Sequence, residues 1–130
     1  MHGLTKLTNR TSDVTAQPGF SSLVRLARSG KVFIKISALY RCSSLTDADG
    51  DGGYEDMEPL IKAFAREVPN QLVWGSDWPH TRSDRSEATR WRQQGFREVD
   101  DAAVMRNVRE WVGEEVWYQM TVVTPTRLYL

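Results

Sequence analysis

Apolar positions in the first half of the chain follow a helical spacing and then a strand-like one. After a polar opening, apolar residues recur every three or four positions over 19–29, and Gly30 is a natural helix end. Residues 31–39 then alternate β-branched positions with others, and Phe33 makes the second side apolar as well. A strand that is apolar on both sides is typical of a covered, parallel sheet. We therefore predict a helix over 19–29 and a strand over 31–39.

The second half repeats this order. Residues 55–67 place their apolar side chains on one helical face, and 71–75 is a short apolar run. Asp100 opens a further helix that Gly113 ends, and 114–123 has the spacing of a last helix. Helices that alternate with strands imply parallel pairing, so the pattern predicts an α/β fold.

The second predicted strand runs into a group of polar side chains. Residues 72–80 read Leu-Val-Trp-Gly-Ser-Asp-Trp-Pro-His, so an acid, a hydroxyl and an imidazole follow the end of a buried strand. In α/β folds, ligands sit outside the carboxyl ends of the strands. The stretch therefore indicates a strand-end active site, with a simple turn capped by Asp77 as the alternative.

Three separated passages carry a resemblance to a known family. LVWGSDWPH, at 72–80, resembles the last-strand signature of the amidohydrolase-related proteins, the group of the 2-pyrone-4,6-dicarboxylate lactonase type. GKVFIKISALYR, at 30–41, is similar to an earlier strand with the pattern Lys-x-Ser-Gly-x-Tyr-Arg, and here Ala38 replaces the Gly. TPTRLYL, at 124–130, is similar to the closing Asn-Pro-x-Arg-Leu-Tyr, with Thr124 in place of the Asn.

The resemblance implies the C-terminal portion of a (β/α)8 TIM-like barrel. Residues 1–130 would form one partial domain, with the last strands and the C-terminal helices, because a closed barrel needs about 250 residues. Two strands leave edges unpaired, and such edges invite self-association. We expect a truncated product or half of an assembly, inactive alone.

The family implies hydrolysis of a lactone or amide, with the aspartate after the last strand as general base. That residue is Asp77 here. A strand-end carboxylate beside a desolvating Trp78 can have its pKa tuned toward working pH. His80 would orient Asp77 or contact the substrate.

Four further residues are expected to bind the substrate. Tyr40 and Arg41 lie at the mouth of the earlier strand in the family pattern, and Arg41 suits bidentate binding of a substrate carboxylate. Strand alternation places Lys35 and Ser37 on one face, which points inward in a barrel. The alternative for Lys35 is a side chain that extends to solvent at the strand rim.

A resident metal is not assigned. Many relatives bind zinc or another divalent ion through a His-x-His pair, whereas the lactonase type works without metal. This chain has no such pair, and His2 and His80 are its only histidines. Asp77 is a possible ligand, but with one histidine the set is short for zinc, which the full-length family could still hold.

A second motif matches a calcium loop. The pattern D-x-D-x-D-G-x5-E is formed by Asp47, Asp49, Asp51, Gly52 and Glu58. No helix is expected before it, and Pro59 would remove a hydrogen bond from an exiting helix. An acidic surface loop is the simpler interpretation. A calcium-binding protein or a non-catalytic remnant stays open as an alternative function.

Composition narrows the class of partner. Lys plus Arg equals Asp plus Glu at 17 each, which favours neither nucleic acid nor an anionic membrane. The arginine-rich stretch 81–96 is interrupted by acids and is expected to be a loop over the site. A single Cys42 excludes an internal disulfide, and no apolar run is long enough to span a membrane. We expect a cytoplasmic protein that acts on a small-molecule substrate.

Overall fold

Helices and two short strands alternate along the chain, as the periodicity predicts. The computed structural model describes residues 13–45, 53–81, 92–93 and 95–130. The elements are, in chain order, η1 (Val14–Ala16), α1 (Phe20–Arg28), β1 (Ile34–Ser37), α2 (Leu39–Cys42), η2 (Glu55–Met57), α3 (Glu58–Glu67), η3 (Pro69–Gln71), β2 (Leu72–Gly75), α4 (Asp101–Val112), α5 (Glu114–Tyr118), the π-helical η4 (Gln119–Val123) and α6 (Thr124–Tyr129). The mixed α/β class is confirmed.

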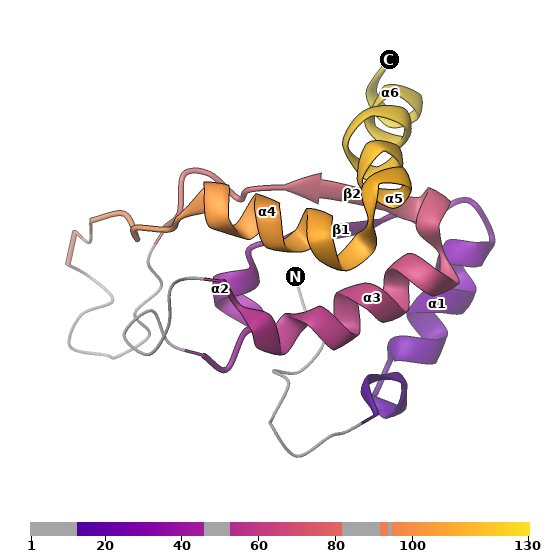
Figure 1. Cartoon of the computed structure of the whole chain (residues 1–130), viewed down its shortest axis with the longest axis horizontal. Coiled ribbons are helices and arrows are strands. Elements are labelled where there is room, and N and C mark those ends of the chain that lie inside the picture. The colour runs from indigo at the N-terminus through magenta and orange to yellow at the C-terminus, as the bar shows by residue number, and fades with distance from the viewer. Residues whose placement is uncertain (1–12, 46–52, 82–91, 94) are drawn as a thin grey trace.

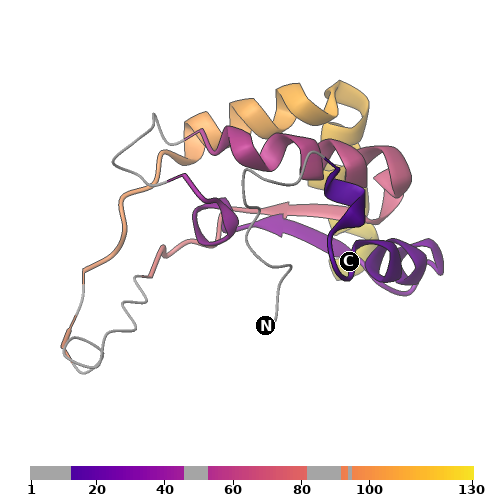
Figure 2. The same cartoon turned by 90° about the horizontal axis from the view of Figure 1, so that it is seen from below.

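The two strands pair in parallel, and α3 and α4 run side by side along one face of the sheet (Figures 1 and 2). The register joins Ile34 to Leu72 at the start and Ser37 to Gly75 at the end. The carboxyl ends of both strands therefore meet at one edge of the sheet. The described residues hold these two strands, and the other strands of a barrel are not among them.

Alternation along β1 separates the core from the opposite face. Ile34 and Ile36 are buried, whereas Lys35 between them is exposed. Opposite them in β2, Leu72 is fully buried, and Trp74 meets the ring of Trp117 edge to face at 6.1 Å. The buried core is completed by residues of the helices and of the segments between them, among them Phe20, Val24, Ala27, Leu60, Ile61, Phe64, Val104, Val108 and Met120.

Strand β1 is shorter than the predicted strand over 31–39. Ala38 has φ 55°, in the left-handed region, so the extended backbone stops there and Leu39 begins α2. Glycine adopts this conformation without strain, which accounts for the Gly of the similar family pattern at this position. The strand end is therefore set by one backbone angle.

The last helix is longer than the predicted segment over 114–123. Helical backbone continues through η4 and α6 to Tyr129. Pro125 lies in the first turn of α6, and the π-helical turn of η4 comes directly before it. Because proline has no backbone N–H, an unbroken α-helical ladder is impossible there, and wider hydrogen bonding precedes it.

In the part of the chain that the structure describes, we find no helix with the length and apolar character needed to cross a bilayer.

We predict opposite effects for one substitution at two alanines. Ala38→Gly should stabilise the fold by up to about 1 kcal/mol, because it relieves a left-handed non-glycine residue. Ala27→Gly should cost about 1–2 kcal/mol, because Ala27 is fully buried in a helix. Denaturant unfolding of both variants tests this. A loss of similar size at both positions would contradict the conformation assigned to Ala38.

Candidate functional site

Three predicted site residues meet where the two strands end. Tyr40 and Arg41 belong to α2, just after β1, and Asp77 follows β2 by two residues. The Tyr40 hydroxyl donates a hydrogen bond to Oδ2 of Asp77 at 2.8 Å. Nε of Arg41 donates to the same oxygen at 3.2 Å. The parallel register therefore brings residues about 36 positions apart into one hydrogen-bonded group.

Backbone geometry after β2 aims Asp77 at this group. Asp77 has φ 70°, in the left-handed region that asparagine and aspartate tolerate better than most residues. The Trp78–Pro79 peptide bond that follows is cis. The Ser76 hydroxyl accepts a hydrogen bond from the backbone N–H of Trp78 at 3.1 Å, which closes the turn. A strand-end turn thus presents the carboxylate.

Arg41 donates hydrogen bonds to Thr81, in the segment after β2, in addition to its bond with Asp77. Its Nη2 donates to the carbonyl and to the hydroxyl of Thr81, at 3.0 and 2.9 Å. The side chains of Arg41 and Asp77 are 34% and 38% exposed, so a ligand can reach both groups. The ion pair is therefore partly open to solvent.

The pKa of the Asp77 carboxyl is lowered, not raised. The hydrogen bond from Tyr40 is the largest cause. Burial opposes it, and the hydrogen bond and charge of Arg41 and the charge of Lys35 lower the pKa further. The side chain expected to desolvate the carboxylate, Trp78, is 78% exposed. The expectation of a pKa tuned toward working pH by Trp78 is therefore wrong, because the turn directs that ring into solvent.

The phenol ring of Tyr40 is surrounded by cations. The guanidinium groups of Arg41 and Arg97 lie 5.0 and 5.1 Å from the ring centroid. Burial and the hydrogen bond to Asp77 raise the pKa of Tyr40. Two guanidinium groups and the carboxylate of Asp77 therefore lie close to the Tyr40 ring.

Lys35 and Ser37 share a face of β1, as alternation predicts. A Cβ at Gly75 would lie 2.5 Å from Cε of Lys35 and 3.8 Å from Oγ of Ser37, so both side chains lie beside that glycine. The Ser37 hydroxyl is buried and makes no hydrogen bond within the described residues. That this face points into a barrel stays a prediction.

His80 binds a residue that sequence reasoning did not place in the site. Its Nε2 lies 2.9 Å from Oδ2 of Asp101, the first residue of α4, and the imidazole is only 6% exposed. Asp101 therefore takes the Nε2 of His80, and within the described residues His80 makes no side-chain hydrogen bond to Asp77. Contact of His80 with a substrate, the other expectation, stays a prediction. The sequence signal that could have placed Asp101 in the site is an acid at a helix start near a strand end.

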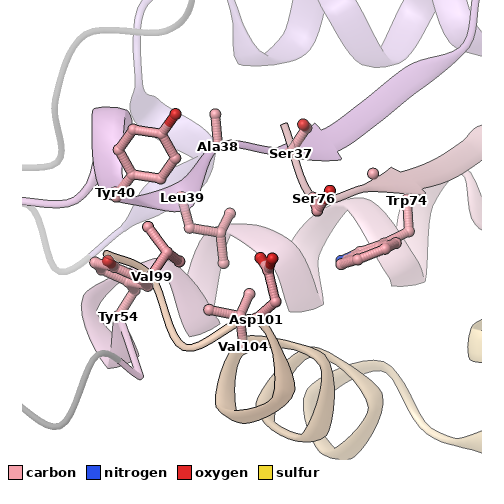
Figure 3. A pocket seen from close by; sticks show the side chains of 11 residues that line it. Ser37, Ala38, Leu39, Tyr40, Tyr54, Trp74, Ser76, Val99, Asp101 and Val104 are labelled. Atoms are coloured by element: carbon pink, nitrogen blue, oxygen red, sulfur yellow. The ribbon is translucent and has the colours of Figure 1, made fainter. Parts of the chain in front are cut away.

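A small pocket lies between the strand ends and α4 (Figure 3). Its volume is about 10 Å³, which holds roughly one water molecule. The carboxylate of Asp101 points toward the strand ends, between Leu39 and Trp74. Ser37, Tyr40, Tyr54, Ser76, Val99 and Val104 also line the pocket. The pocket is therefore too small for more than a solvent molecule, and the side of the site that solvent reaches is that of Arg41 and Asp77.

The described residues do not fit a zinc ion. No group of three or more His, Cys, Asp or Glu side chains lies together within the described ranges. Asp77 is bonded to Tyr40 and Arg41, and His80 to Asp101. These carboxylate and imidazole groups are therefore already engaged.

The calcium loop lies largely outside the described residues. Asp47, Asp49 and Asp51 are outside the described ranges. Glu58, in the first turn of α3, forms an ion pair with Lys62. Pro59 stands at the start of that helix, where a missing N–H removes no helical hydrogen bond. The objection to an exiting helix based on Pro59 is therefore wrong.

Known proteins resemble this chain in sequence and in fold. A family model described as amidohydrolase matches residues 9–120. The 4-sulfomuconolactone hydrolases of Hydrogenophaga intermedia and Rhizobium radiobacter are 32% identical over 65 residues and 36% identical over 62 residues. The D-galactarolactone isomerase of Agrobacterium fabrum is 27% identical over 66 residues.

These matches cover 48–51% of this chain but only 19–21% of the relatives. The chain thus matches about a fifth of their length. The crystal structure of an Agrobacterium tumefaciens protein in its apo form superimposes with a TM-score of 0.66 at 22% identity. That likeness covers 90% of this chain and 36% of the other, and it concerns the fold.

We predict that Tyr40→Phe raises the pKa of Asp77, because it removes the hydrogen bond that contributes most to lowering it. Carboxyl ¹³C NMR over a pH titration measures this, with Asp77→Asn to assign the signal. Tyr129→Phe, which changes an exposed phenol on α6, is the matched control and should leave the pKa unchanged.

The same change should alter how stability depends on pH. The pKa of Asp77 in the folded chain lies below its ordinary value of 3.8, so its stabilising contribution is present above that value and is lost as pH falls through the folded pKa. The stability deficit of Tyr40→Phe should therefore be larger at neutral pH than in strong acid. An equal deficit at both would contradict the hydrogen bond.

Proposed function

This chain belongs to the amidohydrolase family, and we propose that it carries part of a hydrolytic site for a small lactone that bears an anionic group. The observation behind this proposal is the cluster of Tyr40, Arg41 and Asp77 at the joined strand ends. Two relatives are named as hydrolases of a lactone with a sulfo group, which is anionic. A cationic neighbourhood around one carboxylate suits such a substrate.

Asp77 is the proposed general base. Its low pKa keeps it ionised at neutral pH and so able to accept a proton. The attacking water would transfer a proton to Asp77 while its oxygen bonds to the lactone carbonyl carbon. The acyl C–O bond then breaks, the ring oxygen takes up a proton, and the product is a hydroxy acid.

Arg41 couples substrate binding to the strength of this base. When a substrate anion takes the guanidinium, Asp77 loses a hydrogen bond and a nearby positive charge, both of which lower its pKa. The carboxylate then becomes a stronger base. Catalytic competence would thus arise with the bound substrate, and it would be low in the free site.

Lys35 and Ser37 are proposed to contact the substrate from the strand face. Lys35 already acts on Asp77 through its charge, so it lies close enough to influence the reacting groups. The buried hydroxyl of Ser37 is one polar group available beside it. No step is assigned to a metal, because the described residues do not make a zinc site.

We propose that the 130-residue chain is inactive alone. Its match extends over about a fifth of the hydrolases it resembles, so further parts of a barrel would complete the site. Within the described residues, β1 and β2 pair only with each other, and their outer edges carry backbone groups that another strand can bind. Self-association through these edges is the accompanying proposal.

We predict that Arg41→Gln weakens binding of a carboxylate-bearing lactone by about 10-fold to 100-fold, the usual value of a charge-assisted hydrogen bond. Binding of the unsubstituted lactone should be unchanged. NMR titration of the natural polypeptide that contains these residues measures both. Arg109→Gln is the control, because Arg109 lies on α4 and pairs with Glu114 of α5. Equal losses for charged and neutral lactones would contradict the role of Arg41.

We predict that Asp77→Asn lowers kcat for lactone hydrolysis by about 10²-fold to 10⁴-fold, the usual contribution of a general base. The measurement uses the natural polypeptide that contains these residues and identifies the hydroxy acid product. Asp13→Asn removes an exposed carboxylate that caps η1 and is the control. Undiminished turnover in Asp77→Asn would refute the assignment.

A further inference from the structure

We propose that Asp101 is a positioning residue that acts through His80 on Tyr40, and so keeps the Tyr40 hydroxyl on Asp77. This inference rests on the proposed function, in which Asp77 accepts the proton. It adds to the site a residue of α4 that reaches neither substrate nor base. Three contacts in series carry it.

The first contact fixes the imidazole. Oδ2 of Asp101 lies 2.9 Å from Nε2 of His80, whose side chain is 94% buried. A carboxylate in this position requires the proton on Nε2 and holds the plane of the ring. A buried N–H that lost this acceptor would cost free energy, so the pair resists separation.

The second contact transmits that orientation to the phenol ring. His80 and Tyr40 meet edge to face, with centroids 5.5 Å apart and planes at 84°. The carbonyl of His80 also accepts a hydrogen bond at 2.7 Å from the backbone N–H of Arg97, whose guanidinium lies on the Tyr40 ring. Tyr40 is only 7% exposed. Its ring therefore has little freedom while His80 stays in place.

The third contact is the one that matters for the base. Tyr40 reaches Oδ2 of Asp77 at 2.8 Å, a distance that a modest rotation of the ring would break. The series Asp101, His80, Tyr40 and Asp77 thus links the start of α4 to the strand-end carboxylate. Helix capping does not explain Asp101, because the cap is Asp100, which accepts from the Ala103 N–H at 2.9 Å.

Neighbouring acids provide a matched pair of variants. Asp101→Ala and Asp100→Ala each remove one negative charge from the start of α4, so their effects on the helix dipole are alike. Asp100→Ala also removes the cap and should cost about 1 kcal/mol of stability. If Asp101 has only a structural role, Asp101→Ala should therefore have no effect beyond those of Asp100→Ala.

The measured quantity is the pKa of Asp77, which carboxyl ¹³C NMR of the full chain determines. Asp101→Ala should raise that pKa, by no more than Tyr40→Phe does, and Asp100→Ala should leave it unchanged. The sign is diagnostic, because direct loss of a neighbouring negative charge would lower the pKa of Asp77. Added to Tyr40→Phe, Asp101→Ala should give no further rise.

Thermal melts identify any variant that fails to fold, and Asp101→Asn, which keeps an acceptor of the same shape, then replaces Asp101→Ala. It should give a smaller rise of the same sign. A folded variant of Asp101 with an unchanged or lowered pKa at Asp77 overturns the inference. If the rise occurs but Asp77→Asn hydrolyses lactone normally, the proposed function fails while the positioning role stands.

Discussion

The parallel pairing of β1 with β2 is the constraint on which the candidate site depends. Because Ser37 lies opposite Gly75, the two chains leave the sheet side by side. Left-handed backbone at Ala38 and Asp77 then turns each chain at once, so α2 and the acidic turn face each other. A shift of one residue in this register would separate Asp77 from its hydrogen-bond donors and reverse the face that each side chain occupies. Core packing under α3 and α4 fixes the register, because Ile34, Ile36 and Leu72 must all be buried.

Electrostatics gives the site its chemical character. A carboxylate held by a phenol and a guanidinium stays ionised, but its low pKa makes it a weak base. In the proposed function, an anionic substrate that competes for the guanidinium raises this pKa and so strengthens the base. Family membership, the lactone-acting relatives and the cationic surroundings of Tyr40 agree with that proposal. The second group, His80 with Asp101, contacts the first through the ring of Tyr40, and its imidazole is shielded from solvent.

Much of this arrangement could be predicted from the sequence, because it depends on local periodicity. Apolar spacing located α1, α3, α4, α5 and both strands, and the polar residues after Gly75 indicated Asp77, whereas α2 and α6 lie outside the predicted helices. The family resemblance placed Tyr40 and Arg41 at the mouth of the first strand as substrate-binding residues, but their hydrogen bonds to Asp77 were not predicted. The bond between His80 and Asp101 could not be predicted, since 21 residues separate them and the intervening path sets their distance. The exposure of Trp78 was equally hidden, because the side-chain direction depends on the turn geometry and not on the residue type.

The candidate site depends above all on the hydrogen bond between Tyr40 and Asp77, which the strand pairing makes possible. A double-mutant cycle with Tyr40→Phe and Asp77→Asn tests that bond most directly, with the free energy of unfolding of each variant measured in denaturant at neutral pH. We predict a coupling free energy of about 0.5–1 kcal/mol, modest because the carboxylate is partly exposed. Two losses that add to within about 0.3 kcal/mol would mean that the residues do not interact, and would contradict the site described here.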